Sequence, residues 1–185
     1  MEIAGRLKTE TAAAHDRLDA RLDLLAGHDR YAAALTRCWG FYAGAEPLLD
    51  RWHAEAGLLD WPERRKLEAL RADLLALGHT PAEIDALPVR RFAGPPGVGT
   101  GLGWLYVLEG ATLGGAVIAR HLRRQRTVPP GALRFHTLYG RQLGARWRAF
   151  HAALARWVGD DAARGDIVVA GALSTFAAFE EWCLP

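Results

Sequence analysis

Apolar residues in this chain recur at intervals of three and four positions, and they do not alternate with polar ones. At the N-terminal end the recurring positions are Leu7, Thr11, Ala14, Leu18, Leu22 and Leu25. This spacing places them on one face of an α-helix, whereas a strand would need an apolar residue at every second position. Composition agrees, because 34 Ala, 27 Leu and 21 Arg stand against only 12 Val and Ile together. The sequence therefore predicts an all-α fold.

Glycine, proline and capping residues separate the predicted helices. We expect helices over residues 1–25, from 29 onward with Asp29 as N-cap and a kink or break near Pro47, over 62–77 after an Asp60 cap, and over 81–87, 102–123, 141–158 and 161–182. Gly27 and Gly78 act as helix stops in this prediction, and residues 92–100 form a loop. A chain of 185 residues, 50% of them hydrophobic, can bury one sizeable core, so we expect one domain over residues 1–185.

Charge and cysteine content exclude several classes of protein. The formal net charge of +2 provides no long-range field that would attract a nucleic acid. Cys38 and Cys183 are too few for a disulfide framework, and the N-terminal residues lack the apolar run of a signal peptide. Residues 98–119 carry Glu109 as their only charge, but this central carboxylate and six glycines argue against a membrane span. We therefore expect a cytoplasmic protein with no nucleic-acid or membrane partner.

One predicted helix is unusually rich in glycine. Residues 102–123 contain Gly103, Gly110, Gly114 and Gly115, and each interior glycine lowers helix stability by about 1 kcal/mol relative to alanine. The last three remove side chains from adjacent turns, so something approaches this backbone closely. Two explanations stay open at this point. Another helix packs on the Gly-x-x-x-Gly pattern, or a flat ligand lies against a locally unwound helix.

His15 and Lys8 are the first candidate site residues. His15 lies on the apolar side of the first predicted helix, and Lys8 precedes it by two turns, about 10 Å along the axis. The pair suits a metal-bound imidazole with an ammonium group on a peripheral carboxylate, but a core histidine and a solvated lysine explain the same residues. The sequence contains no zinc-protease, nucleophile-elbow or dinucleotide motif.

Two segments resemble the haem oxygenase family, and in particular its bacterial biliverdin-producing branch associated with bacteriophytochromes. The first segment reads Lys8-Thr9-Glu10-Thr11-Ala12-Ala13-Ala14-His15. The second reads Tyr106-Val107-Leu108-Glu109-Gly110-Ala111-Thr112-Leu113-Gly114-Gly115. The order and separation of the segments, and the length of the chain, are similar to those of that family.

The resemblance implies an all-α fold that holds haem between a proximal helix and a kinked, glycine-rich distal helix. His15 matches the proximal residue that binds the haem iron through a neutral imidazole. The distal residues expected to take part in catalysis are Gly110, Thr112, Gly114 and Gly115. The residues expected to contact haem or its propionates are Lys8, Thr11, Tyr106 and, on a late helix, Arg146 or Arg148.

The implied reaction is three successive oxygenations of haem, both substrate and cofactor, to biliverdin, carbon monoxide and ferrous iron. The chain has no flavin or iron–sulfur motif, so O2 chemistry needs electrons from a ferredoxin or flavin reductase. A basic cluster is the candidate docking surface for that donor, although cations at a helix end also offset the helix dipole; its arginines are Arg120, Arg123, Arg124 and Arg126.

Ala111 departs from the family pattern, since many members carry an aspartate there that organises water near bound dioxygen. A proton relay must then use Thr112, backbone carbonyls or a different water chain. Two alternatives to the enzyme therefore remain. One is a haem carrier or sensor on the same fold that binds haem through His15 without degrading it, and the other is a helical enzyme with an unrelated small substrate.

Overall fold

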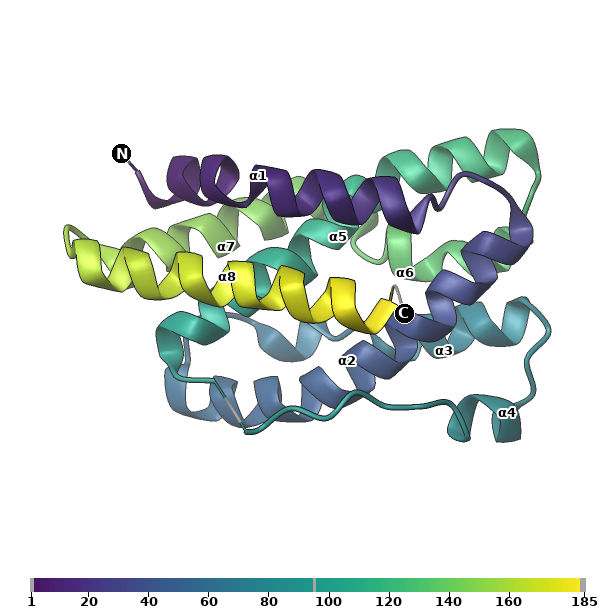
Figure 1. Ribbon diagram of the computed structural model, residues 1–185, viewed down its shortest axis with the longest axis horizontal. Helices are drawn as coiled ribbons and strands as arrows, with labels where there is room; N and C mark the ends of the chain where they lie inside the picture. The colour runs from purple at the N-terminus through teal and green to yellow at the C-terminus, as the bar shows by residue number, and fades with distance from the viewer. Residues whose placement is uncertain (1, 95, 184–185) are drawn as a thin grey trace.

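The computed structural model describes residues 2–94 and 96–183, and helices are the only regular secondary structure among them (Figure 1). The predicted all-α fold is therefore confirmed. The α-helices are α1 (Ile3–Leu22), α2 (His28–Ala56), α3 (Leu67–Ala76), α4 (Pro81–Asp85), α5 (Val98–Gln125), α6 (Arg134–Thr137), α7 (Leu143–Val158) and α8 (Ala162–Cys183). Short 3-10 turns lie between them at η1 (Trp61–Arg64), η2 (Pro130–Leu133) and η3 (Gly140–Gln142).

The connection between α1 and α2 differs from the prediction. Helix α1 ends at Leu22, and Asp23 adopts a left-handed conformation with φ 43° and donates its backbone N–H to the Asp19 carbonyl. Gly27 has φ 134°, which side chains strongly disfavour, and it is the N-cap of α2 and not the stop of the preceding helix. The prediction of Asp29 as the cap is wrong, because Asp29 lies in the first turn of α2.

Two further boundaries are corrected by the structure. Helix α2 is 29 residues long and continues through Pro47, so of the kink or break predicted there the break is absent. A proline removes one backbone donor, and the burial of Leu49 and Trp52 on the same helix compensates for that loss. Asp60 does not begin the long predicted helix: it is the N-cap of the 3-10 turn at residues 61–64 without a side-chain capping bond, because its carboxylate accepts a hydrogen bond from Nε of Arg64 at 2.7 Å. Helix α3 begins later, after Lys66.

Helices α5 and α8 form the central packed pair. A Cβ atom at Gly103 would overlap the carbonyl oxygen of Val168, and one at Gly171 would lie 2.8 Å from the carbonyl oxygen of Thr100. Glycine at this crossing lets the two backbones touch, so helix packing explains Gly103. Both helices are long and apolar enough to cross a membrane, yet 50% and 44% of their most apolar windows are buried, which is consistent with core helices.

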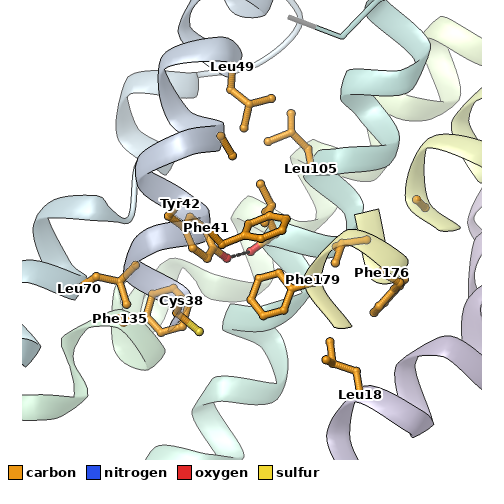
Figure 2. Close-up of a cluster of buried hydrophobic side chains, with 14 of the residues drawn as sticks. Leu18, Cys38, Phe41, Tyr42, Leu49, Leu70, Leu105, Phe135, Phe176 and Phe179 are labelled. Carbon is orange, nitrogen blue, oxygen red and sulfur yellow. Dashed lines mark hydrogen bonds between the residues drawn. The ribbon is translucent and has the colours of Figure 1, made fainter. Parts of the chain in front are cut away.

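Aromatic residues of α2 and α8 fill the core beside α5 (Figure 2). The ring centroids of Phe41 and Phe179 lie 4.4 Å apart. Tyr42 donates its hydroxyl to the carbonyl of Leu108 at 3.1 Å, the dashed line in Figure 2. This bond ties α2 to α5 just before Gly110.

Helix α1 runs alongside α8 and is paired to it near both ends (Figure 1). Arg6 donates to Asp166 at 2.7 Å, and Arg21 donates to Glu180 at 3.1 Å. The two residues of α1 meet the start and the end of α8 in the same order, so the helices are parallel. His15 lies between these two attachments.

Candidate functional site

The second half of α5 presents a face that no other element covers. Cβ atoms at Gly110 and Gly114 would meet nothing within 4 Å among the described residues. On the same stripe Leu113 is 42% exposed and Val117 is 64% exposed. Positions i, i+3, i+4 and i+7 lie on one side of a helix, so these four residues form one apolar surface, here called the bare face. The predicted local unwinding is absent, because α5 is helical throughout.

Gly115 and Thr112 do not belong to the bare face. A Cβ at Gly115 would lie 2.7 Å from Nδ1 of His136, so this glycine admits α6 against α5. Thr112 is buried and donates its hydroxyl to the Glu109 carbonyl at 2.6 Å. Of the four distal residues predicted from the sequence, the structure thus brings only Gly110 and Gly114 to one open surface.

His15 presents an accessible imidazole on α1, with 57% of its side chain exposed. Its ring meets the ring of Phe176 edge-on, with centroids 6.0 Å apart. Nδ1 lies 3.5 Å from Oδ2 of Asp19, one turn further along α1. A carboxylate beside Nδ1 favours the proton on that nitrogen and leaves the lone pair of Nε2 free for a metal. Because α8 carries Phe176 and also packs against α5, one helix connects His15 to the helix of the bare face.

The remaining predicted contacts on α1 and α5 are only partly accessible. Lys8 is exposed, two turns before His15. Thr11 is buried and donates its hydroxyl to the Leu7 carbonyl at 2.7 Å, so its oxygen serves the helix itself. Tyr106 is half-buried one turn before Gly110, and its ring packs against the ring of Trp147 on α7, with the ring centroids 5.9 Å apart.

The two arginines predicted on α7 differ in their surroundings. Arg146 forms an ion pair with Asp60, and its guanidinium lies 3.6 Å from the carboxylate of Glu63. The positive charge of Arg146 is therefore already paired within the chain. Arg148 is exposed and forms no ion pair with any described residue. Of the two candidates, Arg148 is the one whose charge is available to an anion.

A buried charge cluster lies beneath α5, and the sequence reasoning missed it. Its members are Arg64, Lys66, Glu109 and Tyr139. The Glu109 carboxylate accepts from Arg64 at 2.8 Å, from Lys66 at 2.5 Å and from the Tyr139 hydroxyl at 2.7 Å. Burial, and then the neighbouring Glu109, raise the pKa of Tyr139 far above its usual value, so the hydroxyl stays a donor. Glu109 itself was the available signal, as the only charge in its apolar segment.

The arginines at the end of α5 border a separate cavity of about 350 Å³. Arg120, Arg123 and Arg124 line it, whereas Arg126 does not. The cavity also borders His136, whose pKa burial lowers to about 4, so that the imidazole is neutral at physiological pH.

Known proteins share both the sequence and the fold of this chain. The sequence profile of the family described as Heme oxygenase matches residues 1–184. A heme oxygenase of Xanthomonas campestris pv. campestris (strain 8004) is 38% identical over 153 residues, which is 82% of this chain and 87% of that protein.

Solved structures of heme oxygenases share the fold. The protein of Neisseria meningitidis superimposes with a TM-score of 0.76 at 22% identity, covering 99% of this chain and 90% of that one. The protein of Leptospira interrogans superimposes with a TM-score of 0.78 at 18% identity, covering 99% and 98%.

Fold and site together define an all-α protein with an accessible histidine and a bare apolar helix face. The match to the Heme oxygenase family spans residues 1–184, which is nearly the whole chain. The chain belongs to the haem oxygenase family.

Proposed function

We propose that this protein cleaves haem to biliverdin, carbon monoxide and ferrous iron, using O2 and electrons from an external donor. The observation that carries the proposal is the bare face of α5, where Gly110 and Gly114 leave the backbone open between the exposed side chains of Leu113 and Val117. A large flat apolar ligand buries such a surface, whereas a soluble helix without a ligand would gain about 1 kcal/mol from alanine at each glycine.

Helices α1 and α5 each carry residues whose chemistry suits haem. On α1, His15 would offer Nε2 to the iron, and Asp19, 3.5 Å from Nδ1, would favour the proton on that nitrogen. On α5, the bare face would pack against the porphyrin, and the open backbone at Gly110 and Gly114 would leave room for a small ligand. Haem supplies the iron that activates O2, and the protein supplies orientation and a water-poor surface.

Basic and phenolic groups orient the propionates in this proposal. Lys8 and Arg148 are exposed cations, and Tyr106 is a phenolic residue of α5, the helix that carries the bare face. Thr11 contributes only through its packing, because its hydroxyl is taken by the Leu7 carbonyl. The placement of Thr112 away from the bare face directs proton delivery to backbone carbonyls or water instead of its hydroxyl.

The electron donor is a ferredoxin or a flavin reductase in this proposal. Acidic proteins of that kind would dock on the exposed basic cluster at the end of α5, formed by Arg120, Arg123, Arg124 and Arg126. Reaction in the cytoplasm would then provide biliverdin as the chromophore of a bacteriophytochrome.

Haem titration of the full chain tests the axial assignment. We expect a Soret band typical of histidine ligation, its loss in His15→Ala, and its return on addition of imidazole. His28→Ala is the matched control, since His28 is also exposed and its Nδ1 lies 3.0 Å from a carboxylate of the next residue. An unchanged spectrum in His15→Ala would show that another residue binds the iron.

A non-degrading haem carrier is the second candidate, favoured by the methyl group of Ala111 next to Gly110. The haem complex, supplied with ascorbate or reduced ferredoxin, distinguishes the two. Release of biliverdin and carbon monoxide supports the enzyme. A haem complex that survives repeated reduction in air, without bilin absorbance, supports the carrier and contradicts the enzyme.

A further inference from the structure

A hollow also lies beside α5, and no residue of the bare face lines it. It is the cavity of about 350 Å³ between the second half of α5 and the segment from α6 to the start of α7. Helix α5 lines it with Thr112, Ala116 and Arg120, which recur at intervals of four residues. Gly110 and Gly114 do not line it, so the cavity is separate from the proposed haem surface.

The cavity is strongly basic. Arg120, Arg123 and Arg124 border it, and no aspartate or glutamate of residues 2–94 or 96–183 does. The ion pairs among the described residues involve none of these three arginines. Tyr139 also lines the cavity, and its hydroxyl is donated to the Glu109 carboxylate, which two buried cations already neutralise. Three positive charges therefore face this space without a counterion from the described part of the chain, and they outweigh the partial negative charge at the end of α5.

His136 provides an independent sign of a missing partner. It borders the cavity with only 4% of its surface exposed, and both ring nitrogens are buried without a hydrogen-bond partner among the described residues. Buried polar atoms in folded proteins nearly always have a partner, and Nδ1 packs against Gly115 of α5, so His136 is an unsatisfied polar group at the border of the cavity.

We propose that this cavity is an oxyanion site that binds a phosphate-bearing small molecule. The planar guanidinium of arginine matches phosphate oxygens two at a time, and several arginines in one cavity favour a ligand with more than one negative charge. At about 30 Å³ for each water, the cavity holds roughly a dozen waters, which is more space than one phosphate ion fills. The cavity therefore has room for a ligand larger than inorganic phosphate, and pyrophosphate is the better probe.

Titration of the full chain, free of haem and in a buffer without phosphate or sulfate, tests the site. We expect calorimetry to show saturable binding of inorganic phosphate and tighter binding of pyrophosphate, while chloride at equal ionic strength does not compete. The NMR signals of the His136 ring shift during the same titration. Arg120→Gln and Arg123→Gln each weaken pyrophosphate binding by about tenfold or more, the effect of losing a charged hydrogen bond.

Arg126→Gln is the matched control, because Arg126 belongs to the same basic cluster and lies outside the cavity. We expect Arg126→Gln to retain its affinity for pyrophosphate. A loss of affinity equal to that of Arg120→Gln would mean that general charge attraction explains the binding, and it would overturn the proposed site. Absence of saturation at about 10 mM pyrophosphate, or binding of an acidic electron donor alone, would overturn it as well. Haem titration of the same variants reports on the bare face separately, so failure of this proposal is distinct from failure of the proposed function.

Discussion

Replacement of Glu109 by glutamine removes the only carboxylate among the members of the buried charge cluster. Glu109, Arg64 and Lys66 each have at most 1% of their side-chain surface exposed. In Glu109→Gln the amide oxygen can accept from one cation, but the amide nitrogen faces the other donors. Lys66 then has no carboxylate within ion-pair distance among the described residues, and Arg64 keeps only Asp60, which lies 2.7 Å from its Nε.

The expected loss of unfolding free energy is about 3–5 kcal/mol, the usual result of breaking a buried ion pair by removing one partner. Three hydrogen bonds to the carboxylate, at 2.5, 2.7 and 2.8 Å, are weakened together, which supports the upper part of that range. Urea unfolding of the haem-free protein followed by circular dichroism measures the change.

Lys66→Met in the same chain is the diagnostic second change. It removes the buried cation that Glu109→Gln leaves without a counterion, so the double variant Glu109→Gln, Lys66→Met recovers about 1–3 kcal/mol relative to the single variant. Arg71→Gln is the control, because Arg71 and Asp85 form an exposed pair worth at most about 1 kcal/mol. A single variant that loses less than the control, or a double variant less stable than Glu109→Gln alone, would refute the reasoning.

Three further outcomes follow from the geometry of the helix faces and of α6. Gly114→Leu blocks haem binding in a spectral titration while unfolding free energy is kept or rises, because nothing described lies within 4 Å of that position. Gly115→Leu lowers unfolding free energy, since its Cβ would lie 2.7 Å from Nδ1 of His136; equal stability of the two variants would contradict the assignment of faces. The pKa of His136 is lowered to about 4, so the unfolded chain binds this proton more tightly, and stability falls as pH drops from about 6.5 to 4, by on the order of 3 kcal/mol. The pKa of Asp73 is raised to about 6 by burial and acts in the opposite direction, so the comparison is between the wild type and His136→Leu, whose unfolding curve lacks the His136 contribution; parallel pH curves would contradict it.

Helix positions were predicted well where side chains decide them, and less well where a turn decides them. Helices α7 and α8 begin and end within two residues of the predicted limits, because both carry long apolar stripes. The error at Gly27 arose because a glycine suits both the end of one helix and the start of the next. Asp60 resembled a helix cap in the sequence, but in the fold its carboxylate forms ion pairs with Arg64 and Arg146.

The sequence by itself determined that the chain is helical, that one helix is unusually rich in glycine, and that His15 precedes that helix in a pattern similar to the haem oxygenase family. These properties depend on local spacing, which a chain carries before it folds. Only the tertiary structure decided that Gly110 and Gly114 lie open while Gly115 receives His136, and that Glu109 binds two cations from a segment more than forty residues earlier. The physical reason is that a helix has several faces, and what each face meets depends on neighbours far away in the sequence.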